Sequence, residues 1–314
     1  MPITMTHRER AITALECRIP DQIPHFELEF KLHKEMFGKD LVTSRQLQGL
    51  PQKEIDYKLE ENANVMVEIY DELDYSIIPI DYLNIEHSIQ TARHLYRLLK
   101  GRKLIMCCCD GTFAIPDGNK MYDFAYRIAD DPDEVHAEAK QKIKEAIEKD
   151  KRLIDAGCEC INLCSDYCYN SGPFLSPQMF REFITPYLAE SIESIRAMGG
   201  YAIKHTDGNI MPILDQLIEC RPHAIHSLDP MAGVDIAEVK KITAAKGVAI
   251  CGNVNCALMQ TGTEEEVRES ALYALKHGKP GGGYFFTTSN IPFRGLPPER
   301  YKLILDIWKE HRDY

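Results

Sequence analysis

The sequence predicts an α/β protein with a (β/α)8 or TIM-barrel fold, and two observations predict it. Eight short apolar runs recur along the chain, as expected for strands buried on both faces. Amphipathic helical segments separate these runs, which favours a parallel sheet, and eight such units favour closure into a barrel. An open doubly wound sheet is the second choice, but no Gly-x-Gly-x-x-Gly follows the first run.

The strands are expected to be short and almost entirely hydrophobic. No composition shift marks a boundary, so residues 1–314 are expected to form one domain with short helical additions at the N-terminus. The predicted strands are Gln22–Leu28, Tyr75–Ile80, Lys103–Cys109, Cys158–Cys164, Tyr201–Lys204, Ala224–Ser227, Val248–Cys251 and Gly283–Thr288.

Capping residues and glycines predict where the helices begin and end. Thr-x-x-Glu capping boxes open two helices, at Thr6 and Thr263. Pro186 is expected to kink or split the helix that contains it. The predicted helices are Thr6–Cys17, about Lys53–Leu73, Asp131–Ala156, Ser176–Met198, Thr263–His277 and Pro297–His311.

Composition narrows the range of partners. The net charge is −11 and no basic tract occurs, which argues against nucleic acid and anionic membranes as partners. The N-terminus lacks the apolar core of a signal peptide, so we expect a cytoplasmic protein. The 11 cysteines are then expected to be reduced and mostly part of the core. A homodimer is the expected assembly.

Polar residues lie at or just after the ends of the predicted strands. In such barrels the C-terminal ends of the strands carry the catalytic groups. Carboxylates, amides and one histidine occupy these positions here. The residues singled out are Glu27, Asp110, Asp166, His205, Asp207, Asn253 and Asn290.

The segment KHTDGN gives the most specific local signal. His205 and Asp207 lie two residues apart at the end of a strand, so both side chains can point into one site. Histidine with a carboxylate can bind zinc or act as an acid–base pair. Asp207 can instead cap the next helix, with Gly208 easing the turn. Asp166 follows a predicted strand, and this position allows two interpretations, a metal ligand or a loop residue.

The remaining strand-end residues are candidates for substrate binding. Asn253 can hydrogen-bond a substrate, or serve as a turn residue beside Gly252. Glu27, Asp110 and Asn290 are assigned to the same role. Cys164 and Cys168 can in principle reach one metal, but a cysteine that ends an apolar strand is more often part of the core.

Longer motifs resemble a known family. THRERAITALECRIPDQIPHF, SGPFLSPQMFREFITPYL, KHTDGNIMPILDQLIE, CGNVN and PGGGYFFTTSN occur in the order seen in the uroporphyrinogen decarboxylase-like superfamily. The resemblance covers nearly the whole chain and implies a (β/α)8 barrel. One kind of member decarboxylates uroporphyrinogen and carries Arg-Gln-Ala-Gly-Arg-Tyr after the first strand. This chain reads Glu-Leu-Glu-Phe-Lys there, which would repel a substrate with eight carboxylates.

The other kind of member comprises corrinoid-dependent methyltransferases, which the chain resembles more closely. Members that act on thiols carry His-x-Cys after the fifth strand and a further Cys near the eighth, and they bind zinc. Here His205 matches the histidine, Asp207 stands in the cysteine position, and Ser289 and Asn290 occupy the second region. Harder oxygen ligands argue against a thiol acceptor and fit an O-demethylase or an enzyme acting on methylated amines.

The resemblance therefore implies methyl transfer between a small methoxylated or N-methylated compound and a corrinoid held by a separate protein. Zinc bound by His205, Asp207 and Glu27 would stabilise the leaving group, with Asp166 as a further catalytic residue. Without a metal, protonated His205 would act as the acid. Two other functions stay open, a cofactor-free decarboxylase and a non-catalytic partner of a corrinoid protein.

Overall fold

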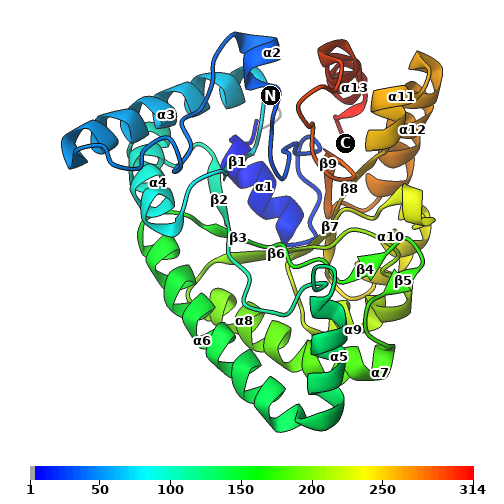
Figure 1. Cartoon of the computed structure of the whole chain (residues 1–314). Coiled ribbons are helices and arrows are strands. Elements are labelled where there is room, and N and C mark those ends of the chain that lie inside the picture. Colours follow the sequence, from blue (N-terminus) through cyan, green and yellow to red (C-terminus); the bar gives the residue numbers. More distant parts are fainter. Residues whose placement is uncertain (1–3) are drawn as a thin grey trace.

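The computed structural model describes residues 4–314. Seven parallel strands form one curled sheet in the order β1-β2-β3-β6-β7-β8-β9, with helices packed outside it (Figure 1). This arrangement confirms the predicted barrel. The sheet strands are β1 (Ile77–Ile80), β2 (Leu104–Cys108), β3 (Cys160–Leu163), β6 (Tyr201–His205), β7 (Ala224–His226), β8 (Ala249–Val254) and β9 (Tyr284–Thr288).

The predicted first strand, Gln22–Leu28, does not form a regular strand, although it occupies the eighth position of the barrel. His25 forms a single parallel bridge with Phe286, and the His25 carbonyl accepts a hydrogen bond from the Ser76 N–H at 2.7 Å. The segment therefore lies between β9 and β1 and closes the ring. Pro24 explains the irregularity, because proline has no N–H to donate to a strand ladder.

The helices agree closely with their sequence signals. Both capping boxes form, and Pro186 lies in the first turn of a second helix, so the predicted Ser176–Met198 helix is split in two. The helices are α1 (His7–Leu15), α2 (His33–Phe37), α3 (Gln52–Glu72), α4 (Ile85–Leu99), α5 (Lys120–Asp130), α6 (Pro132–Asp155), α7 (Pro177–Phe183), α8 (Thr185–Ala197), α9 (Leu214–Glu219), α10 (Ile236–Ala244), α11 (Cys256–Thr261), α12 (Glu264–Gly278) and α13 (Pro298–His311), with 3-10 turns η1 (Met211–Ile213) and η2 (Pro230–Ala232).

The two ends of the barrel differ. Helix α1 closes the end where the strands begin, since Arg8 donates its N–H to Arg102 and forms an ion pair with Glu159 there. Loops cover the opposite end, including the hairpin of β4 (Cys168–Tyr169) and β5 (Gly172–Pro173). Within residues 4–314, every helix is too short or too polar to cross a membrane.

Helix α6 carries one buried acid on the outside of the sheet. Asp150 is completely buried, and neither of its carboxylate oxygens accepts a hydrogen bond from the described residues. Burial raises the pKa of Asp150 from 3.8 to about 7. The unfolded chain therefore loses this proton first, so the carboxyl costs stability as the pH rises from about 4 to about 7.

We expect Asp150→Asn to raise the Tm by roughly 5 °C at pH 8 and by less at pH 5, because the neutral amide removes the ionisation. Thermal unfolding followed by circular dichroism measures both values. Glu148→Gln, on the exposed side of the same helix, is the matched control. An equal gain at both pH values would show that ionisation of Asp150 does not limit stability.

Candidate functional site

Three side chains from neighbouring strand ends converge at the open end of the barrel. Asp166 follows β3, while His205 ends β6 and Asp207 follows it. One ligand atom from each lies within 4.8 Å of the other two. His205 Nε2 lies 3.7 Å from Asp166 Oδ1 and 3.7 Å from Asp207 Oδ1. The structure thus brings together the three residues predicted to be catalytic.

Asp207 is held by its neighbours and does not cap a helix. Its Oδ1 accepts a hydrogen bond from Ser227 Oγ at 2.8 Å, and its Oδ2 accepts one from Asn290 Nδ2. Gly208 has a φ of +80°, and a Cβ there would lie 2.4 Å from the Cys168 carbonyl oxygen. Glycine therefore lets the β4 hairpin pack directly behind Asp207.

Asp166 is positioned through the backbone on both sides of it. Ser165 N–H donates to Asp110 Oδ2 at 2.9 Å, and Tyr167 N–H donates to Thr206 Oγ1 at 2.8 Å. Asp166 Oδ1 in turn accepts the Asp207 N–H at 3.0 Å. The loop after β3 is therefore tied to both β2 and β6, which fixes where the Asp166 carboxylate can point.

Asp110, predicted to bind substrate, instead forms a buried ion pair. Its Oδ2 lies 3.0 Å from Lys204 Nζ, and its Oδ1 accepts the N–H and the hydroxyl of Thr112. Burial alone raises the pKa of Asp110, but the Lys204 charge and the hydrogen bonds outweigh it, so the net pKa is lowered. Asp110 thus holds Lys204 on β6 and Ser165 in the loop after β3 in place.

His205 is a neutral base at neutral pH. Burial lowers its pKa to about 4, and the nearby Asp166 charge only partly opposes this effect. The expected alternative, in which protonated His205 acts as the acid without a metal, therefore requires a pH well below 7. Burial raises the pKa of Asp207 to about 7, so Asp207 is the better proton donor of the two.

The structure does not bring Glu27, predicted as a metal ligand, into the cluster. Its carboxylate is fully buried and accepts hydrogen bonds from the N–H of Thr288 at 3.1 Å and from its hydroxyl at 2.6 Å. Burial raises the pKa of Glu27 to about 8. Glu27 thus links the irregular first segment to β9, and Asp166 provides the second carboxylate near His205.

The two asparagines have different surroundings. Asn290 donates to Asp207 and is therefore part of the site. Asn253 donates from Nδ2 to the Leu228 carbonyl at 2.8 Å and lines a separate cavity between β8 and α12. The structure therefore groups only Asn290 with the histidine and the two aspartates.

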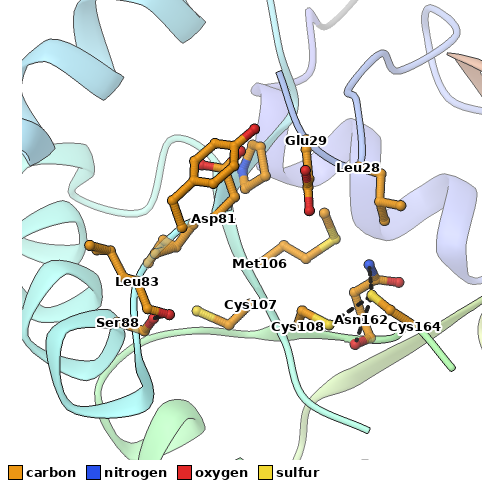
Figure 2. A pocket seen from close by; sticks show the side chains of 13 residues that line it. Leu28, Glu29, Asp81, Leu83, Ser88, Met106, Cys107, Cys108, Asn162 and Cys164 are labelled. Atoms are coloured by element: carbon orange, nitrogen blue, oxygen red, sulfur yellow. Dashed lines mark hydrogen bonds between the residues drawn. The ribbon is translucent and has the colours of Figure 1, made fainter. Parts of the chain in front are cut away.

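A pocket with a cavity of about 110 Å³ opens over the ends of β1, β2 and β3. Figure 2 shows Glu29 and Asp81 on one side of it and Cys108, Asn162 and Cys164 on the other. The two thiol sulfurs lie 2.8 Å apart. Cys164 lies two residues before Asp166 in the chain, so the pocket and the cluster lie at the same end of the barrel, although none of the three cluster residues lines the pocket.

Asp81 and His226 are two residues whose roles the sequence did not reveal. Neither oxygen of Asp81 accepts a hydrogen bond from the described residues, and burial raises its pKa well above the ordinary value. A neutral carboxyl there can donate a hydrogen bond into the pocket. His226 contacts His205, with the two Nδ1 atoms 2.9 Å apart. In the sequence, only the position of His226 near the end of a predicted strand indicated this contact.

The chemistry of the cluster fits a divalent metal ion. An ion about 2.0–2.1 Å from nitrogen and oxygen ligands places neighbouring ligands roughly 3.4 Å apart in a tetrahedron. The distances of 3.7 Å between His205 Nε2 and the two carboxylate oxygens are close to that value. His205 is almost fully buried, whereas the Asp166 side chain is 46% exposed, so the open side of the cluster faces the barrel mouth.

Comparison with known proteins places these features in context. Residues 112–311 match the model of the uroporphyrinogen decarboxylase (URO-D) family. A methyltransferase from Methanosarcina mazei has a similar structure, with a TM-score of 0.78, 14% sequence identity and coverage of 98% of this chain and 99% of that chain. A D-psicose 3-epimerase from Clostridium cellulolyticum H10 gives a TM-score of 0.46 at 10% identity, over 82% of this chain and 93% of that chain. No curated protein sequence matches the chain.

We expect the chain to bind about one equivalent of Zn²⁺ when it is purified without a chelator or a metal-affinity resin. His205→Ala and Asp207→Asn should each lose the metal, because each removes one of three ligands. Elemental analysis measures the stoichiometry. His94→Ala, on the surface helix α4, is the control. Zinc retained in both site variants would place the ion elsewhere.

Proposed function

The chain belongs to the uroporphyrinogen decarboxylase (URO-D) family, and we propose that its site catalyses methyl transfer. The proposed activity is transfer of a methyl group from a small methoxylated or N-methylated compound to the cobalt of a corrinoid, which a separate protein presents at the barrel mouth. The observation that carries the proposal is the cluster of Asp166, His205 and Asp207, which lies at the same end of the barrel as the pocket.

The acidic mouth argues against decarboxylation of uroporphyrinogen. Glu29 and Asp81 line the pocket, and Glu29 already forms an ion pair with Lys31 at 2.9 Å. A substrate with eight carboxylates needs cationic partners, and none of the described residues that line this pocket is a lysine, an arginine or a histidine. An uncharged ether or a methylated amine needs no such partner. The full-length likeness in fold to a methyltransferase is consistent with this choice.

Demethylation requires stabilisation of a poor leaving group. Zn²⁺ bound to the cluster would supply a Lewis acid for the oxygen or nitrogen that loses its methyl group. His205 would provide a neutral nitrogen ligand, and Asp166 and Asp207 would provide oxygen ligands. Ser227 and Asn290 hold both oxygens of Asp207 by hydrogen bonds, so that carboxylate keeps its orientation when a substrate enters.

The pocket suits the body of a small donor. Leu28, Pro79 and Met106 provide apolar walls, and Asn162 and Asp81 provide hydrogen-bonding groups. Asp81 has no partner among the described residues, so a donor or acceptor on the substrate can bind it at little cost. Together these residues would orient the methyl group toward the open side of the cluster.

We expect the purified, zinc-loaded protein to convert cob(I)alamin to methylcobalamin with at least one donor from a panel of methoxylated aromatic compounds and methylated amines. The visible spectrum of the corrinoid measures the reaction. His205→Ala should reduce the rate to that without enzyme, because the Lewis acid is lost with its ligand, while His94→Ala should not change it.

Two outcomes would contradict this function. Release of carbon dioxide from a carboxylated substrate without any corrinoid would identify a decarboxylase. Binding of a corrinoid protein that survives both His205→Ala and Asp207→Asn, with no turnover of any donor, would identify a non-catalytic partner.

A further inference from the structure

His205 and His226 face each other through the same ring atom. Their Nδ1 atoms lie 2.9 Å apart, and the two residues are paired in the register of β6 and β7. Both rings are buried, with 5% of His205 and none of His226 exposed. Two nitrogens at this distance share one hydrogen, because two lone pairs or two N–H groups would repel each other. One ring therefore donates and the other accepts.

A second hydrogen bond decides which ring donates. Thr287 Oγ1 donates its only hydrogen to the Thr288 carbonyl at 2.9 Å. The same oxygen lies 3.4 Å from His226 Nε2, so it can only accept there. His226 thus carries a hydrogen on Nε2. Among residues 4–314, no acidic side chain acts on His226. A charged, unpaired imidazolium is costly in a core, so Nδ1 of His226 is the acceptor.

The same reasoning assigns the protons of His205. Its Nδ1 carries the hydrogen that His226 accepts, which leaves a lone pair on Nε2. That lone pair lies 3.7 Å from Asp166 Oδ1 and from Asp207 Oδ1. Once Asp207 has lost its proton, three electron-rich atoms converge with no hydrogen between them. A bound cation stabilises such a set, whereas an Nε2–H at that place would make a simple acid–base pair with the carboxylates.

We propose that His226 and Thr287 are positioning residues that hold His205 in the Nδ1–H tautomer and so direct its Nε2 lone pair to a metal ion. The proposal rests on the metal site of the proposed function, but it concerns the order of protons in the protein itself. The relay runs from the Thr288 carbonyl through Thr287 and His226 to His205, entirely within β6, β7 and β9.

The tautomer can be observed directly in the metal-free protein. Two-bond ¹H–¹⁵N correlation spectra of the ¹⁵N-histidine-labelled full chain distinguish a protonated ring nitrogen from an unprotonated one. We expect Nδ1 of His205 and Nε2 of His226 to carry the hydrogens. A hydrogen on Nε2 of His205 in the wild-type protein, alone or on both nitrogens, would overturn the proposal without the need for any variant.

Substitutions at Thr287 test the relay. Thr287→Val removes the acceptor, so His205 should populate the Nε2–H form and Zn²⁺ should bind about tenfold to a hundredfold more weakly in a competition titration. Thr287→Ser keeps a hydroxyl and should restore both properties. Thr243→Val is the matched control, because Thr243 is buried in α10 with a hydroxyl that has no partner among the described residues.

These results separate the proposal from the function. If Thr287→Val keeps the wild-type tautomer and zinc affinity, the relay does not position His205. If the tautomer is as expected but no donor is demethylated, the proposed reaction is wrong and the positioning role stands.

Discussion

The buried ion pair of Lys204 and Asp110 is the interaction on which the site depends. Lys204 Nζ also donates to the Ser165 carbonyl at 2.9 Å and lies 4.0 Å from the centre of the Tyr167 ring. One charged group therefore holds the ends of β2, β3 and β6 in a fixed relation. A buried charge is tolerated only when such partners are complete, so this part of the barrel has little freedom to rearrange.

That constraint determines the geometry of the proposed metal ligands. Lys204 immediately precedes His205 on β6, and the segment that it binds carries Asp166. Without the ion pair, the loop after β3 would be held to the end of β6 only by the hydrogen bonds of Tyr167 with Thr206 and of Asp207 with Asp166. The cluster is therefore organised without an ion, which would lower the conformational cost of binding one.

Much of this architecture could be predicted from the sequence, for a physical reason. Parallel strands buried on both faces are continuously apolar. The seven strands of the main sheet were therefore recognisable in the sequence as short hydrophobic runs. The segment around Pro24 is also apolar, but its proline has no N–H to donate to a strand ladder. It therefore closes the barrel through the hydrogen bonds between Glu27 and Thr288 instead of a full ladder. Apolar composition alone cannot distinguish these two cases.

The site could be predicted in part. The ends of the predicted strands indicate which residues can form the cluster, but not which residues hydrogen-bond to them. His205, Asp207 and Asp166 follow strands directly, and the structure brings them together. The contacts of His226 and Ser227 depend on the register between β6 and β7, which no local pattern encodes. Glu27 was assigned as a ligand because it lies near the end of the predicted first strand, whereas its carboxylate accepts hydrogen bonds from Thr288.

The distribution of exposure across the cluster bears on what can react there. His205 is buried against His226, while Asp166 and Asp207 are partly open to the barrel mouth. An ion held by these three groups would have its remaining coordination positions on the side of the pocket and the solvent. A catalytic metal requires that open position, whereas a structural metal does not have one. The exposed Asp166 carboxylate marks the side on which this position would be open.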